Sequence, residues 1–151
     1  MKTYLVLALS LSLCSGFNLA DCQADLKGLF ISYAHAVLDW NSVINFRQAI
    51  QETGYAVQFL GNALIDCDPL PSGLFSPATL QEAGEQLIHY SDSLEFDPLI
   101  NFASDSTCEE KLEVLIENAQ YFLKTKQGHS FILQSLHDFM LTCHQDFESY
   151  F

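Results

Sequence analysis

The chain has 151 residues and a formal net charge of −13, with 19 acidic residues against 6 lysines and arginines. Hydrophobic residues make up 49% and charged residues 17%, a mixture that can bury a core and differs from that of a disordered chain. Nucleic acids and anionic membrane surfaces both require a basic patch, so we expect neither as a partner.

The first residues have the pattern of a secretory signal peptide. Lys2 supplies the positive charge, and an apolar run from Tyr4 to Leu13 follows it. Cleavage after Gly16 places small residues at the recognition positions, and cleavage after Ala20 is the alternative. The run is shorter than the roughly 20 residues that span a membrane. We therefore expect a signal peptide over 1–16 and one domain over 21–151, secreted or in the lumen of the secretory pathway, without stable membrane insertion.

The cysteine count supports export. Either cleavage removes Cys14 and leaves four cysteines, Cys22, Cys67, Cys108 and Cys143. An even count in an exported chain predicts two disulfides. No two of these cysteines have the C-x-x-C spacing of a zinc or thioredoxin-like site.

The spacing of the cysteines favours one pairing. Each of the stretches Cys22–Cys67 and Cys108–Cys143 contains a helical pattern, a break and a second helical pattern, so each can form a hairpin closed at its open end. The second stretch fits well, because its turn lies near its midpoint. The turn of the first lies closer to Cys22, a difference that a kink or a longer turn must absorb.

Hydrophobic periodicity predicts the helices of the first hairpin. Apolar residues recur every three or four positions over 21–40, which is typical of an amphipathic helix. Residues 41–42 offer a break or a new helix start. The next helix, over 43–67, has a near-heptad rhythm, and Gly54 and Gly61 within it permit a close helix contact or a bend.

The remaining helices are marked by their start and stop signals. Ser76-Pro77 begins a helix that the pattern continues to about Leu94. Ser106 to Glu109 has the capping-box spacing, with Ser106 as the cap, and Gly128 stops the helix that follows. A last helix runs from about Ser130 to the end. We see no alternating run that predicts a strand, so we expect an all-α bundle of about five helices.

The sequence contains no pattern typical of a catalytic or metal-binding site. His137 and His144 are two helical turns apart, about 11 Å, which is too far for both to bind one metal directly. The acidic clusters do not match the spacing of an EF-hand loop, and no catalytic motif is present. We therefore expect no enzymatic activity, no metal and no cofactor, with the histidines partly exposed on helices.

The two connectors between helices are unusually apolar. Their side chains either cover the ends of the bundle, which we favour, or form the rim of an apolar pocket. We expect a small, secreted, acidic, non-enzymatic helical module that binds another macromolecule or has a structural role. The alternative is an extracellular carrier of a hydrophobic small molecule or lipid, and an acidic calcium-binding protein has less support than either. The residues expected at the pocket rim are Leu70, Leu74, Phe75, Phe96 and Phe102.

Overall fold

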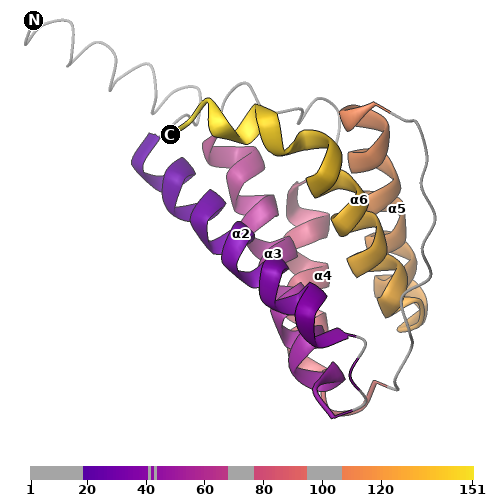
Figure 1. Ribbon diagram of the computed structural model, residues 1–151. Coiled ribbons are helices and arrows are strands. Elements are labelled where there is room, and N and C mark those ends of the chain that lie inside the picture. The colour runs from indigo at the N-terminus through magenta and orange to yellow at the C-terminus, as the bar shows by residue number, and fades with distance from the viewer. Residues whose placement is uncertain (1–18, 41, 43, 68–76, 95–106) are drawn as a thin grey trace, which may run out of the picture.

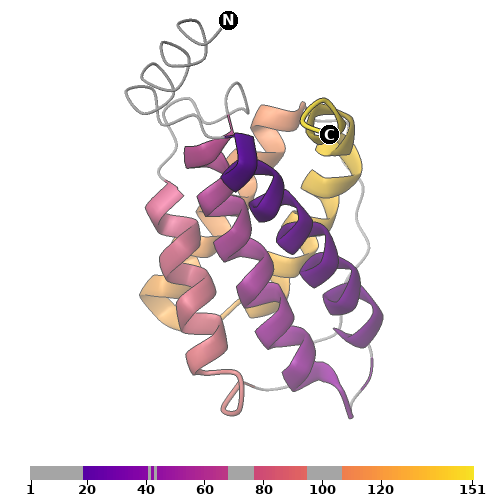
Figure 2. The ribbon, with the colours of Figure 1, turned by 90° about the vertical axis from the view of Figure 1, so that its left-hand side faces the viewer.

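The computed structural model describes residues 19–40, 42, 44–67, 77–94 and 107–151, and these residues are all-α as predicted. Helices α2, α3 and α4 lie side by side, and α5 and α6 lie to their right in Figure 1 and behind them in Figure 2. None of the described helices is long and apolar enough to cross a membrane. Residues 1–18 lie outside the described part, so the signal peptide and the domain boundaries stay predictions. The helices are α2 (Leu19–Trp40), α3 (Phe46–Asp66), α4 (Pro77–His89), α5 (Cys108–Thr125) and α6 (His129–Glu148).

Two disulfides close two helical hairpins, which confirms the predicted pairing. Cys22 pairs with Cys67 at a Cα–Cα distance of 4.9 Å, and Cys108 pairs with Cys143 at 5.5 Å. The bonds join residues 45 and 35 positions apart. On the chain-entropy model, closing loops of this length stabilises the fold by roughly 4 kcal/mol per bond.

The first hairpin closes through a longer turn, one of the two alternatives that its spacing left open. Helix α3 begins at Phe46, later than predicted, because Asn45 donates its backbone N–H to the carbonyl and the hydroxyl of Ser42 in a turn. The arms from Cys22 to Trp40 and from Phe46 to Cys67 then differ by less than one turn of helix. The connection between the helices absorbs that difference.

Helix α4 is shorter than predicted, ending at His89 rather than near Leu94. Serine hydroxyls compete with helical amides for the carbonyls that a longer helix would use. Ser91 Oγ donates to the Ile88 carbonyl, and Ser93 Oγ donates to the Tyr90 carbonyl, each at 3.0 Å. Ser91 also accepts a hydrogen bond from Gln51 on α3, which fixes this turn against the bundle.

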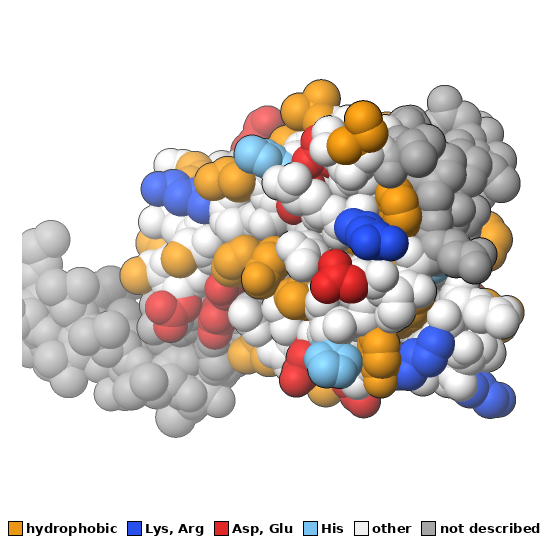
Figure 3. All heavy atoms as spheres, turned by 90° about the horizontal axis from the view of Figure 1, so that it is seen from below, with side chains coloured by type: hydrophobic (Ala, Val, Ile, Leu, Met, Phe, Trp, Pro, Cys, Tyr) orange, Lys and Arg blue, Asp and Glu red, His pale blue; other side chains and the backbone are white. Residues whose placement is uncertain are grey.

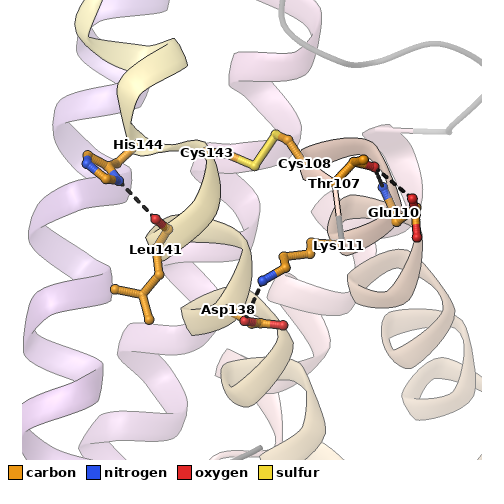
Figure 4. The surroundings of a disulfide bond; sticks show 8 residues. All are labelled: Thr107, Cys108, Glu110, Lys111, Asp138, Leu141, Cys143 and His144. Atoms are coloured by element: carbon orange, nitrogen blue, oxygen red, sulfur yellow. Dashed lines mark hydrogen bonds and ion pairs between the residues drawn. A yellow bond between two sulfur atoms is a disulfide. The ribbon is translucent and has the colours of Figure 1, made fainter. Parts of the chain in front are cut away.

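The cap of α5 lies one residue later than predicted. Thr107, rather than Ser106, is the N-cap, and its hydroxyl accepts from the backbone N–H of Glu110 (Figure 4). The same hydroxyl donates to Glu110 Oε1 at 3.1 Å. Threonine and glutamate three positions apart can form this cap, as serine and glutamate can. The helix uses the motif at 107–110 rather than the overlapping motif at 106–109.

The turn between α5 and α6 uses two left-handed residues. Gly128, the predicted stop, has φ 77°, and Lys126 has φ 58°. Glycine adopts this conformation freely, whereas a lysine there is uncommon. Lys126 is held by its side chain, because Nζ donates to Gln86 Oε1 of α4 at 3.0 Å and to the Leu123 carbonyl at 3.2 Å.

Helix α6 joins the two hairpins by packing antiparallel along α2. Three ring contacts lie along this seam, and at one end the side-chain amide of Gln23 donates to the Tyr150 carbonyl. The ring contacts, read down α2, are Phe30 with Phe147, Tyr33 with His137, and Trp40 with His129.

A buried ion pair lies within the α5–α6 hairpin. Lys111 Nζ is 2.8 Å from Asp138 Oδ1, roughly one turn from the Cys108–Cys143 bond (Figure 4). The lysine side chain is 8% exposed and the aspartate side chain 20%. Removing one partner of a buried pair leaves the other charge uncompensated. The loss of stability should therefore be larger when the more deeply buried lysine is the partner that remains.

We expect Asp138→Ala to lower the free energy of unfolding by about 2–4 kcal/mol, because it leaves the buried Lys111 ammonium without its partner. Lys111→Met should cost clearly less, because methionine fills the apolar space and water can reach Asp138. Urea unfolding of both single variants and of the double variant measures the difference and the coupling. Equal losses for the two single variants would contradict the asymmetry.

Candidate functional site

The predicted pocket rim is not part of the described structure. Its five residues, Leu70, Leu74, Phe75, Phe96 and Phe102, lie in 68–76 and 95–106, which the structure leaves undescribed. The rim and the hydrophobic carrier that it suggests therefore stay predictions. Within the described residues, a hollowed surface lies along α3 and α4.

Helix α3 presents three faces, each marked by a seven-residue step. Ile50, Val57 and Leu64 are buried in the core. Glu52, Phe59 and Asp66 meet α2, and Gly54 and Gly61 meet α4. Residues seven apart lie two turns apart on the same face of a helix, so the near-heptad pattern of the sequence places a different neighbour against each face.

Glycines bring α3 and α4 unusually close together. A Cβ atom added to Gly84 of α4 would lie 2.4 Å from the Gly54 carbonyl oxygen of α3 and 2.4 Å from Gln58 Cγ. A Cβ atom added to Gly61 would lie 2.9 Å from the Pro77 carbonyl oxygen. Gly54 and Gly61 therefore make the close helix contact that was one of the two alternatives predicted for them.

The groove lies on the surface above this contact. Its first part has a volume of about 500 Å³, and its second part, of about 480 Å³, shares Gln58 and Glu85 with it. Gln81 Nε2 donates to Asn62 Oδ1 at 2.7 Å, which ties the two walls together. The first part is lined by Tyr55, Gln58, Phe59, Asn62, Ala78, Gln81, Glu82 and Glu85, and the second adds Gln86, Ile88, His89 and Tyr90.

The groove combines apolar, amide and acidic surface with one histidine, His89, and its lining contains no lysine or arginine. Tyr55 is 47% exposed, so its ring is open to a ligand. Tyr90 is 37% exposed, and its ring already contacts His89 and lies near the Lys126 ammonium. Glu82 and Glu85 supply negative charge along α4. Elsewhere, on the face shown in Figure 3, basic side chains are scattered among polar, acidic and hydrophobic groups.

Carboxyl groups also meet across the α2–α3 contact. Burial raises the pKa of Asp25 to about 7, with smaller contributions from the hydrogen bond with Asp66 and from the charges of Asp66 and Asp21. At the other end of the contact, burial raises the pKa of Glu52 to about 7, with smaller contributions from the hydrogen bond with Asp39 and from the charge of Asp39. The sequence signal for these pairs was weak, because the partners are far apart in the chain.

One histidine, His129, is more enclosed than predicted, whereas His137 is partly exposed as predicted and His144 is exposed. His129 is 8% exposed and contacts the ring of Trp40. His137 is half-buried, stacks on Tyr33 and shares a hydrogen bond with its hydroxyl, and burial raises the pKa of that Tyr33 hydroxyl. In the described part of the chain, no three histidine, cysteine, aspartate or glutamate side chains are grouped as metal ligands.

Comparison of the chain with protein-family models, curated proteins and solved structures finds no match in any of the three.

We expect Gly84→Ala to destabilise the fold by about 1–3 kcal/mol, because the new methyl group meets the α3 backbone and forces the helices apart. The gain in helix propensity, up to about 1 kcal/mol, offsets only part of this cost. The midpoint of urea unfolding measures the change. Adding Gln58→Ala removes the side-chain clash alone, so the double variant should stay destabilised, and full rescue by it would contradict the backbone contact.

Proposed function

We propose that this protein is a small, secreted, non-enzymatic module that binds a lysine- or arginine-bearing segment of another protein along the α3–α4 groove. The groove is long, open and shared between two helices, which suits a peptide segment better than an enclosed small molecule. Two disulfides in an acidic helical bundle are consistent with an extracellular protein or one in the secretory lumen.

The observation that carries the proposal is the side chain of Lys126. Its ammonium group donates to Gln86 Oε1 and lies 5.6 Å from the centre of the Tyr90 ring. Gln86 and Tyr90 both line the second part of the groove. The protein therefore already docks one of its own lysines at the edge of this surface, through an amide and an aromatic face.

The rest of the groove offers similar chemistry to further cations. The exposed Tyr55 ring can receive a cation on its face, an interaction of roughly 0.5–1 kcal/mol at an exposed site. Glu82 and Glu85 can pair with lysine or arginine, and Gln58 can supply amide hydrogen bonds. Such pairs favour a cationic partner mainly through association rate and specificity.

The test uses a short peptide rich in lysine and leucine, with a counterpart that has glutamate in place of lysine. Only the basic peptide should bind, and its affinity should fall as salt is raised, because exposed charge pairs are screened. Titration calorimetry of the disulfide-bonded protein measures both effects, and circular dichroism checks that each variant is folded.

We expect Glu82→Lys/Glu85→Lys to weaken binding of the basic peptide by about tenfold or more, equivalent to about 1.4 kcal/mol. Tyr55→Ala should also weaken binding, through loss of the ring. The matched control, Glu113→Lys/Glu117→Lys, changes the net charge equally at exposed positions of α5 and should have a much smaller effect.

Equal losses in the groove and control variants would reject the groove in favour of general charge attraction. Absence of binding to the basic peptide would also reject the proposal. Saturable binding of an apolar dye that a fatty acid displaces, without binding of the basic peptide, would instead favour the carrier of hydrophobic molecules.

A further inference from the structure

Two pairs of carboxyl side chains lie at the two ends of the contact between α2 and α3. Asp25 and Asp66 share a hydrogen bond near the Cys22–Cys67 disulfide. Asp39 and Glu52 share one at the opposite end, beside the turn between the helices. Phe59 lies between the two pairs, with its ring over Gly28 of α2.

Each pair needs a proton to be satisfied. Asp25 Oδ2 and Glu52 Oε2 are both buried, and neither receives a hydrogen bond from an amide, hydroxyl or ammonium group of the described residues. A carboxylate only accepts hydrogen bonds, whereas a protonated carboxyl group can also donate one. A hydrogen bond between two carboxyl groups therefore requires that one of them keeps its proton.

The charged and polar groups that face these pairs in the described residues do not remove the need for that proton. Asp21, on α2, adds negative charge near Asp25. His35 Nδ1 lies 3.8 Å from Glu52 Oε1, but the His35 side chain is 61% exposed, so solvent screens it. Gln48 of α3 hydrogen-bonds Glu52 and partly opposes its protonation.

Helix α6 packs against α2 from the other side and adds two titratable groups, His129 beside Trp40 and His137 beside Tyr33. Lys111, the buried lysine of α5, is paired with Asp138. No lysine or arginine of the described residues lies within ion-pair distance of Asp25 or Glu52.

We propose that the α2–α3 hairpin is a proton-dependent clamp, which is tightened in acid by one shared proton at each end and loosened near neutral pH when both protons leave. Loosening leaves two carboxylates facing each other at each end of the contact. The Cys22–Cys67 bond keeps the helices joined, so the clamp changes the rigidity of the hairpin rather than separating its arms.

The direction of the pH effect follows from the two raised pKa values. Burial and the neighbouring carboxylate raise the pKa values of Asp25 and Glu52 from ordinary values near 4 to about 7. Between about pH 4 and pH 7, the folded chain therefore holds protons that the unfolded chain has lost, and stability falls as pH rises through this window. Below about pH 4 the stabilisation by the shared protons is complete. Above about pH 7 the repulsion between the carboxylates no longer changes with pH.

The experiment compares thermal unfolding of the disulfide-bonded protein at pH 5 and pH 7.5. The wild-type melting temperature should be higher at pH 5. The variant Asp25→Asn/Glu52→Gln, whose amides donate hydrogen bonds at every pH, should melt roughly 5 °C or more above wild type at pH 7.5 and should lose most of the difference between the two pH values.

The matched control is Glu113→Gln/Glu117→Gln, which removes the same charge from exposed positions of α5. It should keep the wild-type difference between pH 5 and pH 7.5. If it flattens the difference as much as Asp25→Asn/Glu52→Gln does, general charge repulsion is responsible and the clamp is rejected. If Asp25→Asn/Glu52→Gln keeps the wild-type difference, other groups are responsible and the clamp is likewise rejected.

Hydrogen exchange with mass spectrometry locates the effect. After correction for intrinsic exchange rates, amides of α2 and α3 should lose protection between pH 5 and pH 7.5 by about tenfold relative to amides of α5 and α6. This relative loss should be absent in the Asp25→Asn/Glu52→Gln variant. A uniform loss over all helices would overturn the assignment to the α2–α3 hairpin.

Discussion

The packing of α3 is the constraint on which the other elements depend. This helix contacts α2 on one side, α4 on another and the core on a third, and a seven-residue step assigns residues to each contact. Ile50, Val57 and Leu64 fill the core, while Gly54 and Gly61 let α4 approach closely. Because protein interiors are close-packed, a change on one face of α3 shifts its position against the other two neighbours.

The disulfides and the aromatic seam have complementary roles in this arrangement. Each disulfide closes one hairpin and restricts the conformational freedom of the unfolded chain. Neither bond joins one hairpin to the other. That connection is made by non-covalent packing of α6 along α2, where three ring contacts follow one another. Aromatic pairs contribute roughly 0.5–1.5 kcal/mol each beyond their buried area, so this seam helps to position the hairpins, together with the α3–α6 and α4–α5 contacts.

The sequence predicted features that depend on local spacing. Apolar stripes defined the helices, and four cysteines on those stripes defined the disulfide pairing. Errors fell where two local signals competed: overlapping capping motifs at 106–110, and serine hydroxyls at 91 and 93 that end α4 early. The carboxyl pairs and the α2–α6 seam join positions 13 to 127 residues apart in the chain, so no window of sequence could reveal them. The groove had only an indirect signal, in the glycines of α3.

The acidic composition acts differently at different places in the molecule. On exposed helix faces it makes a diffuse negative field, which any cation feels and salt screens. In the groove, Glu82 and Glu85 stand beside Tyr55 and fixed amides, so a cation there also meets directional contacts. Lys126 illustrates that difference, because its ammonium group is held by an amide and a carbonyl oxygen and lies near two aromatic rings, without a carboxylate partner among the described ion pairs. Specific recognition on this surface therefore depends more on the shape and polarity of the groove than on the net charge of the protein.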